Sequence, residues 1–273
     1  MARDNDETLV LIDVGNTNTK IGIAKNGTIQ QSFVLPTLTR ETLDTFGMRV
    51  VDLFNFMELS TFAVDAWVVS SVVPQVDHLI RHAGKRYSDC PVYFVPRDIT
   101  LDMNNKYEKP EEVGADRMVT AFAARELFDC SGLIVIDFGT ATTLECVQDR
   151  DYLGGLICPG VSSSLGALGG QTAKLPRIGL ELESQELQIG INTAKSMNHG
   201  FIFGFATMVD GLCNELRKRI KGDVEIVGTG GFAYKIKPVC SSLQTVYTDL
   251  LLKGLYLAYR GQRTEDRRQK TEE

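Results

Sequence analysis

The stretch LVLIDVGNTNTKIGIAKNG, residues 9–27, decides the fold, because the stretch LIVIDFGTATTLECVQDRD, residues 133–151, repeats its pattern. Each begins with an aliphatic run, passes through Ile-Asp-x-Gly into a turn that carries threonines, and continues as a second strand-like run into a polar turn. The two aspartates, Asp13 and Asp137, lie 124 residues apart, which is close to half the chain. A repeat of that length indicates a duplicated domain rather than a solenoid of short repeats.

The rest of the sequence predicts an α/β protein. Strands are expected at 62–74, 91–96 and 224–231, and helices at 40–58, 75–87, 116–128, 194–221 and 248–260. We predict one lobe over 1–114, a second over 115–260, and a polar tail over 261–273 that lacks apolar residues and stays unstructured. The expected fold class is therefore a duplicated pair of domains with mixed β-sheets and a cleft between the lobes.

Composition excludes several classes of protein. The chain has 273 residues, of which 43% are hydrophobic and 23% charged, so it can bury a large core. Its net charge of −6 gives no general attraction to nucleic acid or to anionic membranes, and no apolar run is long enough to span a bilayer. The six cysteines form no CxxC motif, which indicates reduced core thiols in a cytoplasmic protein.

The Asp-x-Gly turns have the groups that a metal-bound phosphate requires. The carboxylate can hold a hard cation, the glycine lets the backbone come close, and amide N–H groups and threonine hydroxyls can contact phosphate oxygens. A single copy could be an ordinary Asx turn, but two copies in matching settings favour a nucleotide triphosphate held between the lobes. A P-loop motif and a dinucleotide fingerprint are both missing.

Two further segments complete the predicted site. GTGG, residues 228–231, follows a strand and can admit a flat adenine or ribose, and SSVVP, residues 70–74, occupies the matching place in the first half. Asp116 stands at the expected start of a helix, where it can act as the general base for an acceptor hydroxyl or simply as an N-cap. Arg117 can bind a substrate carboxylate or phosphate, or can be an ordinary surface arginine.

The motifs DVGNT, SSVVP, VGADR, DFGTATT, GGLICPG and TAKLP occur in this order, and over residues 9–258 the chain resembles the type III pantothenate kinases. That family belongs to the actin-like (ribonuclease H-like) superfamily of sugar kinases and chaperone ATPases, which agrees with the duplication. The resemblance implies ATP-dependent phosphorylation of pantothenate at its primary hydroxyl to 4′-phosphopantothenate, the first step of coenzyme A biosynthesis. It also implies a cytoplasmic homodimer that uses Mg²⁺ with ATP and a monovalent cation, K⁺ or NH₄⁺.

The same resemblance implies roles for individual residues. Asp116 is the expected catalytic base, and Asp137 is the expected ligand of K⁺ or NH₄⁺. Contacts with ATP are implied for Asp13, Val14, Gly15, Asn16, Thr17, Asn18, Thr19, Lys20 and Thr140. The pantothenate pocket is implied to contain Tyr107, Gly114, Ala115, Asp116, Arg117 and Thr193, of which Thr193 reaches across the dimer. Asp13 can contact Mg²⁺ directly or through water.

Several alternatives stay open at this point. A non-catalytic accessory protein of the same fold, or a kinase for another hydroxy acid or sugar, would share much of the pattern, but retention of Asp13, Asp116 and Asp137 favours the kinase. The apolar stripe of the helix at 194–221 predicts a dimer interface or packing within the lobe. Lys20, Arg117 and Lys174 are expected to offset anionic ligands, whereas His78 and His82 are expected on a solvated helix face.

Overall fold

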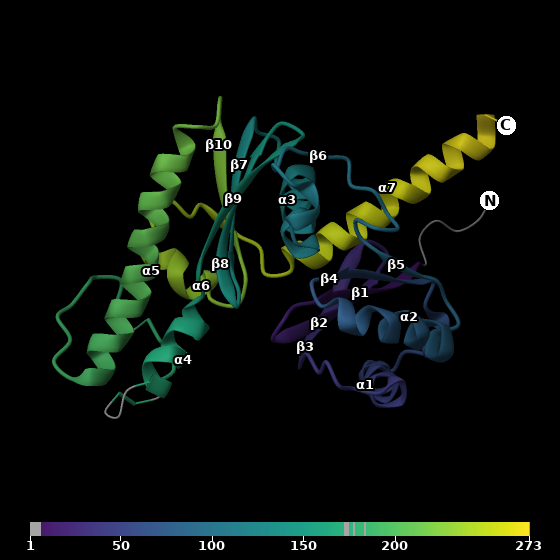
Figure 1. Ribbon diagram of the computed structural model, residues 1–273, viewed down its shortest axis with the longest axis horizontal. Coiled ribbons are helices and arrows are strands. Elements are labelled where there is room, and N and C mark those ends of the chain that lie inside the picture. The colour runs from purple at the N-terminus through teal and green to yellow at the C-terminus, as the bar shows by residue number, and fades with distance from the viewer. Residues whose placement is uncertain (1–6, 172–174, 177, 183, 273) are drawn as a thin grey trace. The chain divides into compact units, whose positions relative to one another are not determined.

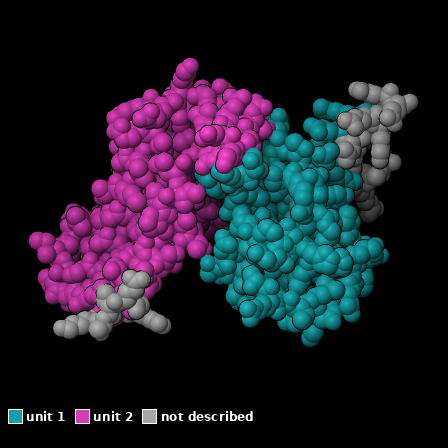
Figure 2. Space-filling view, in the orientation of Figure 1, with its two compact units in different colours: residues 1–102, 111–123, 251–273 teal, residues 103–110, 124–250 magenta. Residues whose placement is uncertain are grey.

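The computed structural model describes residues 7–171, 175–176, 178–182 and 184–272, and Figure 1 shows its helices and strands. The described chain forms two compact units, coloured separately in Figure 2. Unit 1 contains the described residues of 1–102, 111–123 and 251–273, and unit 2 contains 103–110 and 124–250. Each unit is thus assembled from separate stretches of chain. The division of the sequence at 114 and 260 into duplicated lobes stays a prediction.

Unit 1 is built on a five-stranded mixed sheet. The strand order is β3-β2-β1-β4-β5, in which β1 is antiparallel to β2 and parallel to β4. The bounds are β1 (Thr8–Val14), β2 (Asn18–Lys25), β3 (Thr28–Pro36), β4 (Ala66–Ser71) and β5 (Val92–Phe94). Apolar residues of α1 (Leu43–Phe56) and α2 (Pro74–Ser88) form one buried cluster with alternate residues of β1, so both helices cover the same face.

Unit 2 repeats that sheet and adds one strand. Its order is β11-β10-β7-β8-β9-β6, with β7 antiparallel to β8 and parallel to β10. The bounds are β6 (Asn104–Asn105), β7 (Gly132–Phe138), β8 (Ala141–Gln148), β9 (Asp151–Pro159), β10 (Val224–Thr229) and β11 (Thr245–Val246). The register shifts after Ile23 in β2 and after Cys146 in β8, each the sixth residue of its strand. The predicted duplication and the mixed sheets are therefore confirmed.

The helices of unit 2 include one that the sequence did not predict. Helix α4 (Val161–Gln171) has the sequence VSSSLGALGGQ, whose serines and glycines have weak helix propensity. Helix α5 (Thr193–Arg217) matches the predicted long helix and begins after Asn192, whose side chain accepts a hydrogen bond from the Lys195 N–H. The short helix α6 (Ala233–Ile236) follows the glycine turn. Single 3₁₀ turns occur at Thr61–Ala63, Pro110–Glu112 and Lys237–Val239.

The last helix is longer than predicted. Helix α7 (Leu250–Glu272) continues through the segment that was expected to be unstructured. That segment is rich in Gln, Arg, Glu and Lys, which are good helix formers, and it extends a helix whose nucleation the preceding buried residues already support. Near its start, α7 packs in unit 1 against β2 and against α3 (Ala115–Leu127). A Cβ added at Gly22 of β2 would lie 2.7 Å from the Leu252 side chain, and a Cβ added at Gly254 of α7 would lie 2.6 Å from the Val119 carbonyl oxygen of α3.

Four of the six cysteines are core thiols, as expected, and Cys130 and Cys158 are half-buried. All six are free, and Cys90, Cys146, Cys213 and Cys240 are buried. Burial raises the pKa of Cys213 and of Cys240 to about 12, so both stay protonated and unreactive near neutral pH. Within the described residues, no helix combines the length and the apolar character needed to cross a membrane.

Candidate active site

Asp13 lies near the carboxyl end of β1, at the edge of the unit 1 sheet. In the register of the sheet it stands beside Lys20 of β2 and Ser70 of β4. Asp13 and Lys20 are half-buried, whereas Ser70 is fully buried and its hydroxyl has no hydrogen-bond partner among the described residues. The end of β1 therefore gathers a carboxylate, an ammonium group and a spare hydroxyl.

The turn that follows Asp13 presents its tip to solvent. The Gly15 N–H donates to the Asn18 carbonyl oxygen over 3.0 Å, which closes the turn. Asn16, Thr17 and Asn18 are exposed, while Val14 before them and Thr19 after them are buried. We call residues 15–18 the phosphate turn, because the predicted ATP contacts centre on it.

Asp116 lies close to this edge of the same unit. Helix α3 begins at Ala115, so Asp116 is the second helical residue and not the N-cap of the alternative hypothesis. A Cβ added at Gly114 would lie 2.4 Å from Asp116 Oδ1 and 3.3 Å from Val72 Cγ1. The Val72 N–H donates to the Val14 carbonyl oxygen over 3.0 Å. The start of α3 is thus joined through Val72 to the strand end that carries Asp13.

The residues around Asp116 are held in place. Its Oδ1 accepts a hydrogen bond of 2.8 Å from the Arg117 N–H, and a carboxylate in the first turn of a helix is favoured by the helix dipole. Arg117 is only 9% exposed, so the hypothesis of an ordinary surface arginine is wrong. A buried guanidinium requires anionic or polar neighbours, which agrees with a role near an anionic substrate.

Asp137 occupies the matching place in unit 2. It stands in register beside Thr143 of β8 and Thr229 of β10. The next residue after β10, Gly230, has a φ of +89°, and a Cβ there would lie 2.3 Å from Asp137 Oδ1. The carboxylate therefore lies directly against the backbone of the glycine turn, in a space that a side chain would fill. Carboxylate, hydroxyl and carbonyl oxygens are the donors that hard cations prefer.

The turn after Asp137 is tighter than the phosphate turn. The Gly139 N–H donates to the Ala141 carbonyl oxygen over 3.1 Å, and the Ser163 hydroxyl of α4 donates to the Thr140 carbonyl oxygen over 2.7 Å. The Thr140 side chain is exposed. The predicted contact of Thr140 with ATP would thus be made by an exposed residue whose backbone is fixed.

The predicted pantothenate residues are divided between the units. Gly114, Ala115, Asp116 and Arg117 belong to unit 1, and Tyr107 and Thr193 belong to unit 2. The Tyr107 ring packs on Gly154 of the GGLICPG motif, where an added Cβ would lie 3.1 Å from the ring. The neighbouring Tyr152 is buried and donates its hydroxyl to Glu145 over 2.7 Å. Thr193 is the exposed first residue of α5.

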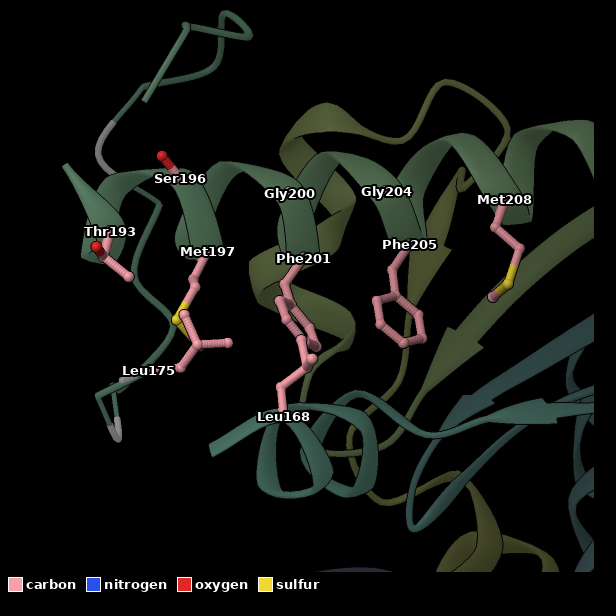
Figure 3. A pocket seen from close by; sticks show the side chains of 10 residues that line it. All are labelled: Leu168, Leu175, Thr193, Ser196, Met197, Gly200, Phe201, Gly204, Phe205 and Met208. Atoms are coloured by element: carbon pink, nitrogen blue, oxygen red, sulfur yellow. The ribbon is translucent and has the colours of Figure 1, made fainter. Parts of the chain in front are cut away.

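Thr193 also stands at one end of an apolar groove in unit 2. Figure 3 shows Met197, Phe201 and Phe205 pointing to the same side from successive turns of α5, with Met197 facing Leu175 and Phe201 facing Leu168 of α4. The groove has a volume of about 510 Å³ and also borders Gly200, Gly204 and Met208. The predicted apolar stripe of the long helix is thus partly open rather than wholly covered within its own unit.

Other sequence-based predictions have simpler outcomes. Lys174, and with it most of the TAKLP motif, lies outside the described residues. His78 and His82 are exposed on α2 with ring centroids 4.0 Å apart, as expected for a solvated face. No group of three or more metal-ligating side chains occurs among the residues that the structure describes.

The sequence analysis missed residues that support the turns. Ser70 and Thr229 stand beside the two aspartates but were noted only as parts of motifs. Thr37 holds the phosphate turn, as described below, and was not noted. A sequence signal for the position of Thr37 was present. Both third strands end in proline, at Pro36 and Pro159, and these prolines occupy matching positions in the registers of the two hairpins, so the residue after Pro36 could have been identified.

The chain is similar to known proteins over most of its length. The profile of the family described as type III pantothenate kinase matches residues 9–215. A type III pantothenate kinase from Nitratidesulfovibrio vulgaris strain DP4 is 49% identical over 252 residues, which cover 92% of this chain and 96% of the relative. Another from Anaeromyxobacter sp. is 40% identical over 252 residues, covering 92% and 98% of the two chains.

The chain belongs to the type III pantothenate kinase family. Solved structures that resemble this chain at low sequence identity support its fold. A ROK family glucokinase from Streptomyces griseus, in complex with glucose and AMPPNP, has a TM-score of 0.52 at 12% identity and covers 93% of this chain and 99% of its own. A Campylobacter jejuni protein provisionally assigned to the Baf family of transcriptional activators has a TM-score of 0.58 at 15% identity, with the same coverage of both chains.

Proposed function

We propose that this protein transfers the γ-phosphoryl group of ATP to the primary hydroxyl of pantothenate, forming 4′-phosphopantothenate and ADP in the first step of coenzyme A biosynthesis. The observation that carries the proposal is the junction of the start of α3, which bears Asp116, with the strand end that bears Asp13 and the phosphate turn. The relatives named type III pantothenate kinase support the choice of substrate.

In the proposed reaction, Asp116 accepts the proton of the pantothenate hydroxyl as the hydroxyl oxygen attacks the γ-phosphorus and ADP leaves. The first turn of α3 fixes the carboxylate in position, which is what a general base requires. The amides of the phosphate turn and Lys20 bind the phosphate oxygens. Arg117 balances the negative charge of substrate or phosphate.

The donor set at the end of β1 fits magnesium that is carried in with ATP. Magnesium needs only one or two carboxylates when phosphates and water complete its shell, and Asp13 with the unpartnered Ser70 hydroxyl supplies oxygen donors of that kind. When bound, Mg²⁺ neutralises charge on the β- and γ-phosphates. Asp13 would hold it directly or through water.

The space around Asp137 fits a monovalent cation. The carboxylate lies against the Gly230 backbone, where a side chain would otherwise fill the space, and Thr229 stands beside it in register. We propose that Asp137 holds K⁺ or NH₄⁺ and that Thr140 contacts ATP. The cation would supply fixed positive charge near the polyanionic nucleotide.

We propose a homodimer in which the groove along α5 faces the second copy. The open apolar groove supports this assignment, and so does Thr193 at its end, which would reach the partner's pantothenate. Phe205→Glu should give monomers in sedimentation velocity, whereas Thr207→Glu, at an exposed α5 residue that does not line the groove, should leave dimers intact. A dimeric Phe205→Glu variant would show that the interface lies elsewhere.

A cytoplasmic location is part of the same proposal. Its support is the set of six free thiols, several of them buried, which fits a reducing compartment.

A coupled assay for ADP tests the proposed function directly. The purified protein is given Mg²⁺-ATP and pantothenate, with and without K⁺, and glucose is tested as a rival acceptor. We expect ADP release that requires pantothenate and increases with K⁺. Release with glucose but not with pantothenate would assign a different acceptor, and no release with either would favour a non-catalytic relative.

A further inference from the structure

Thr37, which follows the end of β3, contacts the phosphate turn at two carbonyl groups. Its hydroxyl donates to the Gly15 carbonyl oxygen over 2.7 Å, and its backbone N–H donates to the Thr17 carbonyl oxygen over 3.0 Å. Its hydroxyl oxygen also lies 2.8 Å from the hydroxyl oxygen of Thr19. One residue outside the turn thus binds the turn at two points and the following residue, Thr19, at a third.

The direction of the hydroxyl bonds follows from the number of protons. The Thr37 hydroxyl has one proton, which it gives to Gly15, so it must accept the proton of Thr19. Thr19 is buried, and the two bonds form a chain in which each polarises the other. Both bonds are lost if the Thr37 oxygen is replaced by a methyl group.

Thr37 is itself held by α1. The Arg49 guanidinium donates to the Pro36 carbonyl oxygen over 3.2 Å and to both carboxylate oxygens of Glu41, at 2.7 and 2.8 Å. The Glu41 side chain is only 4% exposed, so solvent screens this ion pair weakly. The segment on both sides of Thr37 is therefore fixed before any ligand binds.

We infer that Thr37 is a positioning residue that aims the amides of the phosphate turn at a phosphate group. In a trans peptide the C=O and N–H bonds point in opposite directions. Drawing the Gly15 and Thr17 carbonyl oxygens toward Thr37 therefore turns the N–H groups of Asn16 and Asn18 away from it. These two N–H groups can then donate hydrogen bonds to phosphate oxygens on the side of the turn away from Thr37. The inference rests on the proposed function of the turn in binding ATP.

Unit 2 shows that the hairpin does not need this arrangement in order to fold. In unit 2, Gly160 follows Pro159 where Thr37 follows Pro36, and a Cβ on Gly160 would lie 1.9 Å from the Thr140 carbonyl oxygen. Thr142 occupies the place of Thr19, and its hydroxyl has no hydrogen-bond partner among the described residues. The same strands and register form without the threonine pair, so the pair belongs to the particular role of unit 1.

Three variants test the inference. Thr37→Val keeps the side-chain shape but removes the hydroxyl, Thr37→Ser keeps the hydroxyl, and Thr39→Val is the control at an exposed threonine two residues away. We expect Thr37→Val to lower kcat/KM for ATP about tenfold, since two hydrogen bonds that preorganise the turn are lost. KM for pantothenate and the melting temperature should change little, and Thr37→Ser should recover activity to within about twofold of wild type.

Amide hydrogen exchange gives a second readout that needs no catalysis. The Gly15 amide should exchange about tenfold faster in Thr37→Val than in wild type, and at the wild-type rate in Thr39→Val. Unchanged exchange, or unchanged kcat/KM for ATP in Thr37→Val, would overturn the positioning role. If wild type itself releases no ADP with pantothenate, the proposed function fails, and the exchange rate still decides whether Thr37 holds the turn.

Discussion

The two acidic hairpins of this protein share a backbone but differ in their chemistry. The five matching strands have the same order and register in both units, and the β-bulge is at the same position. In each unit the residue that follows the second strand, Asn26 or Asp149, has a positive φ. The differences lie at the turn. Unit 1 has a longer, exposed turn with lysine opposite its aspartate, whereas unit 2 has a tight turn with threonine opposite its aspartate and a glycine against it.

Asp13 and Asp137 hold matching positions in the two hairpins, but the residues beside them differ. Lys20 and the amides of the phosphate turn suit phosphate, whereas Thr143, Thr229 and the Gly230 backbone suit a small cation. The proposed roles are therefore phosphate binding for the first hairpin and monovalent-cation binding for the second.

The largest effect is expected at Asp116, which lies near the end of β1 in the first hairpin. Asp116→Asn removes the proton acceptor while keeping the side-chain size, so kcat should fall by about 10³. ATP affinity, measured by calorimetry, and the melting temperature should stay close to wild type. Turnover near the wild-type level would remove Asp116 from the role of base, and a matching loss of ATP affinity would make it a binding residue instead.

Next in size is the contrast between the two aspartates. Asp13→Asn should lower kcat/KM for Mg²⁺-ATP by about 10² at every K⁺ concentration, because a charge that faces the metal-nucleotide is lost. Asp137→Asn should instead flatten the dependence of kcat on K⁺. Both are measured by titrating K⁺ and ATP in the ADP assay. If the two variants respond alike to K⁺, the proposed division of roles between the hairpins is wrong.

The smallest effect concerns the stability of the second hairpin. Gly230→Ala adds a Cβ that would lie 2.3 Å from Asp137 Oδ1 and 2.7 Å from the Phe138 backbone, in a residue with a φ of +89°. We expect a loss of about 2 kcal/mol in the free energy of unfolding, seen as a lower urea midpoint. Gly231→Ala is the matched control, since a Cβ there meets nothing within 4 Å. Equal midpoints would mean that the carboxylate does not lie against this glycine.

The sequence alone predicted the duplicated framework well, for a physical reason. Buried strand segments such as 133–136 are continuous aliphatic runs, and the Ile-Asp-x-Gly at the ends of β1 and β7 marks the point where the chain turns back in each unit. Helix α4 was missed because its serines and glycines carry almost no helical signal, and because contacts such as Leu168 in the groove only appear once α5 is in place.

The site was predictable only where a residue carries its own chemistry. Asp13, Asp116 and Asp137 could be selected because carboxylates at strand ends and helix starts are informative by themselves. Thr37 and Ser70 could not, since their roles depend on which strands are neighbours and in which register. Arg117 illustrates the same limit, because only the fold shows that this arginine is buried.

Residues 251–272 return to unit 1, which has a consequence for how the protein folds while it is being synthesised. Helix α7 brings Leu252 and Leu255, both fully buried, and the Leu252 side chain lies against β2 at Gly22. The first sheet is translated before the helix that covers it, and residues 124–250 of unit 2 lie between them in the sequence. The nascent chain therefore keeps an uncovered apolar face until α7 has been made, and exposed apolar surface of this kind makes folding intermediates prone to aggregate.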